Sequence, residues 1–127
     1  MKSKYKILIV DDDKFLLDMY AVKFKQSGFE VAASLGSMEA LTKLKDGFLP
    51  DIILTDILMP VMSGFELLSE IKKEDLAKDA KIIILSNMGE KTDIDRGRKL
   101  NVDGYIIKAS MVPSEVVNKV IEIMEEK

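Results

Sequence analysis

Asp51-Ile-Ile-Leu-Thr-Asp-Ile-Leu-Met-Pro-Val-Met-Ser-Gly64 is the most informative segment of this 127-residue chain. Its residues 52–54 form an apolar run that is too short for a helix and lacks a polar face, which is typical of a strand buried on both faces of a sheet. Asp56 follows the run, and Pro60 and Gly64 favour a turn before any helix begins. A carboxylate at the end of a buried strand costs free energy unless something pairs with it. Taken alone, Asp56 is most simply read as a turn or cap residue.

Four further apolar runs have the same short form, and they lie at residues 7–10, 31–33, 82–85 and 105–107. Helical patterns separate the five runs. This alternation predicts an α/β fold, a single doubly wound five-stranded parallel sheet with helices on both faces. A glycine-rich dinucleotide fingerprint and a P-loop motif are both absent, which favours the flavodoxin-like strand order 2-1-3-4-5 of a (βα)5 fold. The length suits one domain, taken as residues 1–127.

Start and stop residues mark several of the predicted helices. Asp13 has the position of an N-cap, and Ser63 with Glu66 has the form of a capping box for a helix that reaches about residue 73. Residues 74–80 are charged and small, so we predict a solvated loop there. Other helices are expected from Ser37, over residues 92–100 and from Pro113. The first helix is expected to present one apolar face, formed by Leu16, Met19, Tyr20 and Phe24.

Composition excludes several functions. The formal net charge of −3, without a concentrated basic face, argues against direct binding of nucleic acid. The chain has no Cys and no His, so it offers neither a thiolate metal site nor the usual general base and zinc ligand. The apolar run at residues 7–10 is too short for a signal peptide core or a membrane span, so we expect a cytoplasmic protein without a membrane partner.

Polar side chains end four of the five predicted strands. Asp11 and Asp12 follow the first strand, Asp56 the third, Ser86 the fourth and Lys108 the fifth. In the predicted order these ends meet at one edge of the sheet, where ligands of such folds bind. Three carboxylates repel one another unless a cation lies among them, and oxygen ligands without His or Cys favour Mg²⁺. With an ammonium and a hydroxyl beside it, Asp56 has the surroundings of a nucleophile that accepts a phosphoryl group.

Two motifs make the chain similar to the receiver domain of the response regulators of two-component signalling. They are Asp56-Ile-Leu-Met-Pro with Ser63-Gly64, and the opening Lys6-Ile-Leu-Ile-Val-Asp-Asp-Asp13. The resemblance covers the whole length. It implies an acidic pair that binds Mg²⁺, the phosphoacceptor, a backbone carbonyl ligand of Mg²⁺, a switch hydroxyl, a switch aromatic residue and a lysine. By this resemblance, the acidic pair is Asp11 with Asp12, of which Asp12 is the more direct Mg²⁺ ligand. Asp56 is the phosphoacceptor and also a ligand, and the carbonyl ligand is that of Leu58. Ser86 provides the switch hydroxyl, Tyr105 is the switch aromatic residue, and Lys108 is the lysine.

The function implied by this resemblance is a phosphorylation-activated switch. A sensor histidine kinase or a phosphotransfer protein would donate the phosphoryl group from a phosphohistidine, because the chain itself has no His. The domain would catalyse its own phosphorylation and dephosphorylation without acting on an external substrate. A downstream target is expected on the face formed by the helix 92–100, the strand 105–107 and the helix from Pro113, and a homodimer is a further expected outcome of phosphorylation.

Two positions depart from the family pattern, and two others bear on the lifetime of the phosphorylated state. Ala109 stands where the family commonly has a cis proline, which predicts either a looser loop or a cis bond without proline. Asn87 stands where a smaller residue is usual, and we expect it to crowd access to the phosphoryl group. Leu58 and Met88 occupy positions that flank the phosphoryl group, where they would shield it from water.

Two other functions stay open at this point. A pseudo-receiver would act as a fixed interaction module without phosphorylation, although the set of carboxylates, Ser86 and Lys108 argues against it. A free-standing Mg²⁺-dependent phosphatase with an aspartyl nucleophile typically has a second Asp two residues later. That position here is Leu58.

Overall fold

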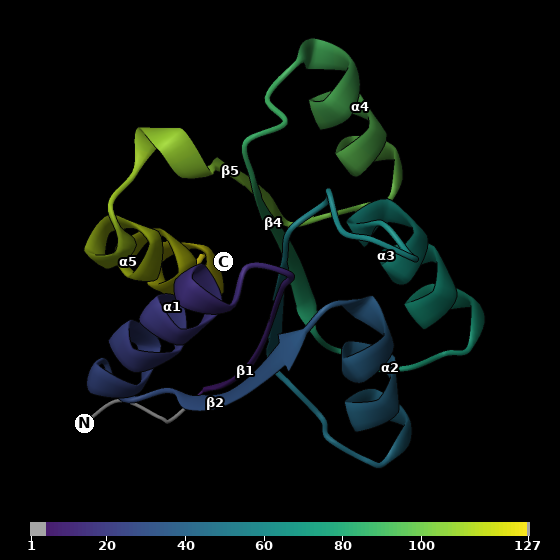
Figure 1. Ribbon diagram of the computed structural model, residues 1–127, viewed down its shortest axis with the longest axis horizontal. Helices are drawn as coiled ribbons and strands as arrows, with labels where there is room; N and C mark the ends of the chain where they lie inside the picture. The colour runs from purple at the N-terminus through teal and green to yellow at the C-terminus, as the bar shows by residue number, and fades with distance from the viewer. Residues whose placement is uncertain (1–4, 127) are drawn as a thin grey trace.

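Five parallel strands form the centre of the structure, in the order β2-β1-β3-β4-β5 (Figure 1). The computed structural model describes residues 5–126, so the first four residues and the last of the predicted domain range lie outside the description. The observed order of the five parallel strands confirms the predicted fold class and strand order. The strands are β1 (Lys6–Asp11), β2 (Glu30–Leu35), β3 (Ile52–Thr55), β4 (Lys81–Ser86) and β5 (Gly104–Ile107). The helices are α1 (Lys14–Gln26), α2 (Ser37–Lys45), α3 (Gly64–Lys73), α4 (Lys91–Lys99) and α5 (Pro113–Met124), with a short 3-10 helix at Lys108–Ser110.

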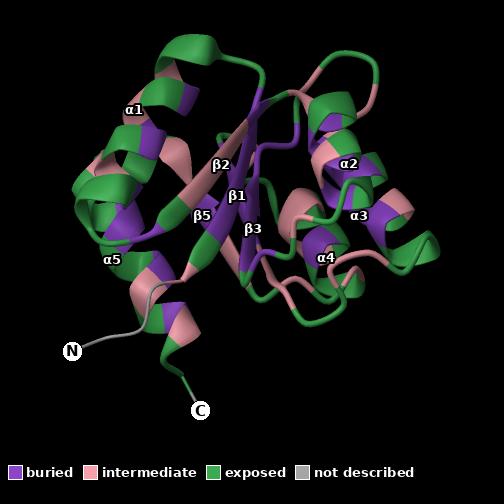
Figure 2. Cartoon of the chain, turned by 90° about the horizontal axis from the view of Figure 1, so that it is seen from below, coloured by how far each residue is buried: buried purple, intermediate pink, exposed green. Residues whose placement is uncertain are grey.

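Helices cover both faces of the sheet (Figure 1). Helices α1 and α5 pack on one face and α2, α3 and α4 on the other, and each face has its own apolar cluster. Successive residues of β1 alternate between them, since Ile7 and Ile9 belong to the first cluster and Leu8 and Val10 to the second. Strands buried on both faces need apolar side chains at every position, which explains the unbroken apolar runs (Figure 2).

The predicted helix caps are confirmed. The Asp13 carboxylate accepts a hydrogen bond of 3.1 Å from Leu16 N at the start of α1. Ser63 and Glu66 form a reciprocal capping box at the start of α3, with bonds of 3.2 and 2.8 Å. These caps fix the direction in which each helix leaves the edge of the sheet that carries the candidate site.

Two local predictions need correction. The buried face of α1 is formed by Leu17, Tyr20, Ala21 and Phe24, whereas Leu16 and Met19 are only half-buried. The buried face of α1 includes Leu17 because β1, β2 and α5 all pack on the helix, so several neighbours set which side chains it buries. The loop 74–80 is not wholly solvated either, since Leu76 packs against the second apolar cluster.

Within residues 5–126, no helix has both the length and the apolar character needed to cross a membrane.

One buried hydroxyl gives a prediction about stability. Ser34 on β2 is 0 % exposed, and among the described residues its Oγ has no hydrogen-bond partner. We expect Ser34→Ala to raise the free energy of unfolding by about 1 kcal/mol, because it removes an unpaired buried polar group. Chemical denaturation of the two proteins measures the difference.

The matched control is Ser37, which is also buried but donates to Met62 O at 2.9 Å. Ser37→Ala should lower the free energy of unfolding, since it leaves that carbonyl without its donor. A loss of stability in Ser34→Ala equal to that of Ser37→Ala would contradict the assignment.

Candidate functional site

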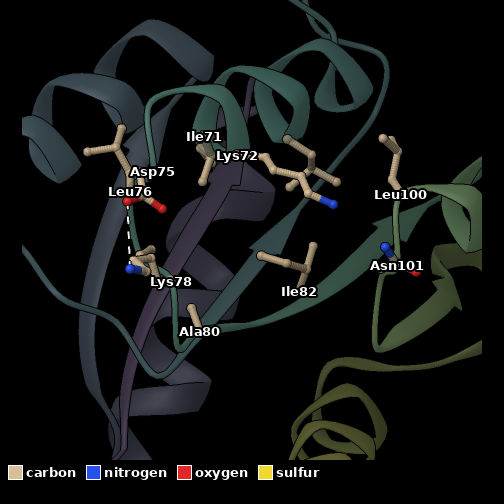
Figure 3. A pocket seen from close by; sticks show the side chains of 11 residues that line it. Ile71, Lys72, Asp75, Leu76, Lys78, Ala80, Ile82, Leu100 and Asn101 are labelled. Carbon is tan, nitrogen blue, oxygen red and sulfur yellow. Dashed lines mark ion pairs between the residues drawn. The ribbon is translucent and has the colours of Figure 1, made fainter.

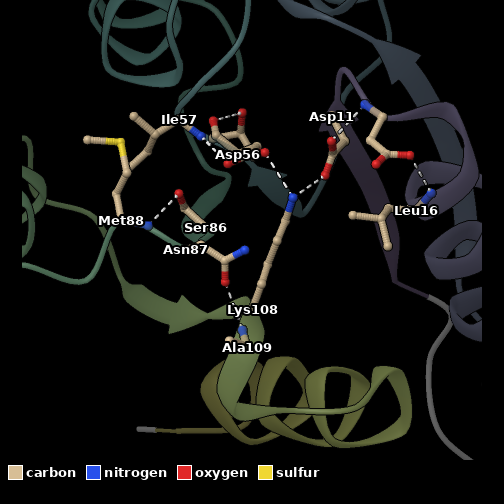
Figure 4. Close-up of polar contacts among 11 residues, drawn as sticks. Asp11, Leu16, Asp56, Ile57, Ser86, Asn87, Met88, Lys108 and Ala109 are labelled. Atoms are coloured by element: carbon tan, nitrogen blue, oxygen red, sulfur yellow. Dashed lines mark hydrogen bonds and ion pairs between the residues drawn. The ribbon is translucent and has the colours of Figure 1, made fainter.

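The strand order brings two buried aspartates together at the carboxyl edge of the sheet. Strands β1 and β3 are neighbours, and Val10 is paired with Thr55 in their register. Asp11, the last residue of β1, and Asp56, the first residue after β3, therefore lie side by side. They are only 3 % and 8 % exposed. Figure 4 shows both carboxylates directed to the same space.

Lys108 bridges these two carboxylates. Its Nζ lies 2.8 Å from Asp11 Oδ2 and 2.9 Å from Asp56 Oδ2 (Figure 4). Lys108 begins the 3-10 helix that follows β5, and its long side chain reaches back toward the end of β1. Lys108 lies 97 residues from Asp11 and 52 residues from Asp56 in the sequence, yet the three side chains form one ion-paired cluster.

Backbone amides hold the other oxygen of each carboxylate. Ile57 N donates to Asp56 Oδ1 at 2.7 Å, and Asp13 N donates to Asp11 Oδ1 at 2.9 Å. Each aspartate is therefore fixed by one backbone donor and by the Lys108 ammonium. Charge-assisted bonds of this kind stabilise the ionised carboxylate and orient it.

The arrangement fits a divalent cation. Asp11, Asp12 and Asp56 each offer a carboxylate oxygen, and these oxygens all lie within 4.8 Å of one another. Asp12 is exposed, so it adds a solvent-accessible ligand to the two buried ones. All donors are oxygens, which suits Mg²⁺ rather than a transition metal. When the three carboxylates are ionised, Lys108 leaves two negative charges unbalanced, which matches a divalent ion.

The pKa values of the cluster reflect both burial and pairing. Burial raises the pKa of the Asp11 carboxyl above its ordinary value, although the hydrogen bonds from Lys108 and from the Asp13 amide work in the opposite direction. For Lys108, burial disfavours the charged form, but the hydrogen bonds to Asp11 and Asp56 outweigh it and raise its pKa. Lys108 is thus held as a cation, whereas Asp11 binds a proton more readily than an exposed aspartate does.

Ser86 lies at the same edge of the sheet, and hydrogen bonds connect it through Met88 to Tyr105. Ser86, at the end of β4, is 1 % exposed, and its Oγ accepts a bond of 3.1 Å from Met88 N. The carbonyl of Met88 in turn accepts from the Tyr105 hydroxyl. Burial raises the pKa of Tyr105 to about 12, so its hydroxyl stays protonated as a donor. The sequence placed Ser86 and Tyr105 at this site, but it did not indicate that Met88 connects them.

The structure resolves the two alternatives predicted at Ala109. Residues 5–126 contain no cis peptide bond, so Lys108 and Ala109 are joined in trans, and the segment forms a short 3-10 helix. Ala109 N donates to Asn87 Oδ1 at 2.9 Å. The Asn87 side-chain oxygen is therefore directed to the Lys108 loop (Figure 4). This contact was not expected from the sequence.

Thr55 and Gly64 support the loop after β3. The Thr55 hydroxyl, fully buried, donates to the carbonyl of Asp56 at 2.9 Å. A Cβ on Gly64 would lie 2.0 Å from that same carbonyl oxygen, so the start of α3 approaches the loop closely only because this residue is glycine. Sequence reasoning missed Thr55, although a polar residue closing an apolar run was a usable signal.

Leu58 and Val61 lie exposed on this loop. The Leu58 side chain is 67 % exposed, and the role of its carbonyl as an Mg²⁺ ligand stays a prediction. Val61 has φ +70°, a left-handed conformation that is rare for a β-branched residue. The loop after β3 thus holds an exposed residue in a strained backbone conformation, five positions after Asp56.

A separate apolar pocket lies at the opposite end of the sheet. Its volume is about 350 Å³, and it is formed by the C-terminal ends of α3 and α4 with the loop 74–80 (Figure 3). Its lining includes Ile71, Ile82 and Leu100 and contains one carboxylate, that of Asp75. The pocket shares no residue with the aspartate cluster, so it takes no part in the chemistry of that site.

Comparison with known proteins identifies relatives of the whole domain. Residues 7–121 match the family described as response regulator receiver domain. The chemotaxis protein CheY of Thermotoga maritima is 37 % identical over 113 residues, which cover 88 % of this chain and 91 % of CheY. The phosphate regulon transcriptional regulatory protein PhoB of Escherichia coli is 29 % identical over 119 residues, which cover 94 % of this chain and 51 % of PhoB. The chain thus spans about half the length of PhoB.

Solved structures agree with this similarity. The CheY-like receiver domain protein of Methanospirillum hungatei superimposes with a TM-score of 0.85 at 29 % identity, covering 97 % of this chain and 95 % of that one. The chemotaxis protein CheY4 of Vibrio cholerae gives a TM-score of 0.86 at 25 % identity, covering 95 % and 99 %.

The raised pKa of Asp11 predicts how Mg²⁺ binding depends on pH. Protons and Mg²⁺ compete for the same carboxylate oxygens, so affinity should fall as pH drops through the raised pKa of Asp11. Below that pKa, each pH unit should weaken binding about tenfold for every proton displaced. Titration of the amide signals with Mg²⁺ at several pH values measures this dependence.

Asp11→Asn provides the control, since it removes the titrating group. This variant should bind Mg²⁺ more weakly at neutral pH and lose part of the pH dependence. Equal slopes in the wild type and in Asp11→Asn would exclude Asp11 as the competing group.

Proposed function

Because this chain belongs to the response regulator receiver domain family, we propose that it is a phosphorylation switch in which Asp56 accepts the phosphoryl group. The observation that carries the proposal is the pair of buried carboxylates, Asp11 and Asp56, that share the Lys108 ammonium beside the exposed carboxylate of Asp12. The donor is a phosphohistidine of a sensor histidine kinase or phosphotransfer protein, because the chain contains no His. The cytoplasmic location predicted from the sequence is part of the same proposal.

In the proposed reaction, an oxygen of Asp56 attacks phosphorus while the bond from phosphorus to the donor imidazole nitrogen breaks. The Ile57 amide holds Asp56 Oδ1, which leaves Oδ2, the oxygen in contact with Lys108, as the nucleophile. Lys108 then neutralises charge on the phosphoryl oxygens, and Ser86 donates to one of them. Mg²⁺ held by Asp11, Asp12, Asp56 and the Leu58 carbonyl supplies further neutralisation of the phosphoryl charge when it is bound.

The proposed output passes through Met88. A move of Ser86 toward the phosphoryl group breaks its bond with Met88 N. Ser86 thereby vacates space, and the ring of Tyr105, whose hydroxyl donates to the Met88 carbonyl, then turns further inward from its half-buried position. This changes the face formed by α4, β5 and α5, where we propose that the downstream target binds or that two phosphorylated copies associate.

Asp56→Asn tests the assignment of the phosphoacceptor. With acetyl phosphate and Mg²⁺, the wild type should gain the mass of one phosphoryl group, whereas Asp56→Asn should gain none, because the amide oxygen is a poor nucleophile. The variant should also bind Mg²⁺ more weakly, since one anionic ligand is lost. Intact mass spectrometry measures the first effect and a metal titration the second.

Asp18→Asn is the matched control, because Asp18 is an exposed aspartate of α1 that pairs with Lys14. It should take up phosphoryl groups like the wild type. A wild-type protein that remains unmodified while binding Mg²⁺ would favour the pseudo-receiver instead.

The lifetime of the phosphorylated state gives a second test. Hydrolysis needs a water molecule in line with phosphorus, and neither Leu58 nor Met88 offers a side chain that holds such a water well. We therefore expect a longer-lived phosphorylated state than in fast chemotaxis-type receivers. The double variant Leu58→Asn with Met88→Glu should decay about tenfold faster, which corresponds to about 1.4 kcal/mol of better water placement. Decay is followed after removal of the donor.

Leu49→Asn is the control for this pair, since Leu49 is 70 % exposed, close to the exposure of Leu58, but lies before β3 at the other edge of the sheet. Its decay should equal that of the wild type. A double variant that decays no faster than the wild type would refute shielding by Leu58 and Met88.

A further inference from the structure

The loop after β4 is joined directly to the loop after β5 and also to β5 itself. Asn87 Oδ1 accepts from Ala109 N at 2.9 Å, and the Met88 carbonyl accepts from the Tyr105 hydroxyl. Gly89 lies so close to β5 that a Cβ there would be 2.9 Å from Ile107 Cδ1. The first loop follows Ser86, the last residue of β4, and the second begins at Lys108. The two groups that face the phosphoryl site from this side therefore belong to one connected unit.

Among these contacts, the bond from Ala109 to Asn87 acts most directly on Lys108. Ala109 is the second residue of the 3-10 helix Lys108–Ser110, and an amide in the first turn of a helix has no acceptor within that helix. Asn87 supplies the acceptor from a segment 22 residues away in sequence. It thereby fixes the backbone from which the Lys108 side chain extends to Asp11 and Asp56.

Ala109 and Asn87, the two residues that depart from the family pattern, are thus hydrogen-bonded to each other. Proline at position 109 would have no amide proton, whereas Ala109 has one to donate. A small apolar residue at position 87 would have no acceptor, whereas Asn87 has one. The donor and the acceptor are both present in this chain, and they face each other.

We propose that Asn87 is a positioning residue for Lys108, which it holds through the amide of Ala109. This inference rests on the proposed phosphorylation of Asp56. Because Asn87 is adjacent to Ser86, the same bond links the position of the switch hydroxyl to that of the lysine. Asn87 itself touches no reacting atom in this assignment.

The first measurement is independent of phosphorylation. In Asn87→Ala, the Ala109 amide should exchange with solvent about fivefold faster than in the wild type, as expected for the loss of one exposed hydrogen bond. Asn87→Asp keeps an acceptor oxygen and should restore the protection. Asn118→Ala changes an exposed Asn of α5 and should leave the Ala109 amide unaffected. Unchanged exchange in Asn87→Ala would overturn the proposal at this step.

The second measurement is the rate of phosphorylation by acetyl phosphate at saturating Mg²⁺. Asn87→Ala should lower the maximal rate about fivefold, or ~1 kcal/mol, because Lys108 is less well placed for the transition state. Mg²⁺ affinity should stay near the wild-type value, and the free energy of unfolding should fall by no more than the loss of one hydrogen bond explains. A loss confined to global stability would show that Asn87 is merely structural.

A double-mutant cycle with Ala109→Pro isolates the bond. Since proline removes the donor, Asn87→Ala should have no further effect on the rate in that background. A full fivefold loss there would refute action through Ala109. If the wild type takes up no phosphoryl group at all, the proposed function fails, whereas the exchange measurement still decides whether Asn87 holds the Lys108 loop.

Discussion

The Lys108 ammonium, shared between two buried carboxylates, is the interaction on which the carboxyl edge of this fold depends. Asp11 ends β1 and Asp56 directly follows the neighbouring strand β3, so their side chains are forced together wherever the order β2-β1-β3-β4-β5 is kept. Two ionised carboxylates in that position would repel each other and lose hydration. Lys108 compensates both, with contacts of 2.8 and 2.9 Å, and the loop after β5 must close over the edge to bring it there.

Most of the architecture could be predicted because the sequence states it locally. A strand such as β1, buried on both faces, needs an unbroken apolar run, and Asp13 and Ser63 cap their helices through contacts within three residues. The candidate site could be predicted for a related reason. Parallel strands place their carboxyl ends at one edge, so the residue after each apolar run gives the contents of the site without any knowledge of side-chain packing.

What could not be predicted depends on contacts between segments far apart in the chain. The buried face of α1 includes Leu17 because three different elements, β1, β2 and α5, pack on that helix, which its own periodicity does not reveal. The acceptor for Ala109 comes from Asn87, and the partner of the Tyr105 hydroxyl is a backbone carbonyl, which has no sequence signature. Val61 at φ +70° is a further case, since local preference argues against a β-branched residue there and the surrounding loop overrides it.

The charge balance of the site suggests why Lys108 is held so close to Asp56. A lysine that waited in solvent would have to be desolvated and ordered during phosphoryl transfer, whereas this one is already in contact with the oxygen assigned as nucleophile. Its raised pKa keeps it cationic, so it can follow the added negative charge from the carboxylate to the phosphoryl oxygens with little movement. In the proposed reaction, the ion pair that stabilises the resting site would also preset its electrostatics for the product, and the position of the Lys108 backbone would then affect the reaction through the side chain that it carries.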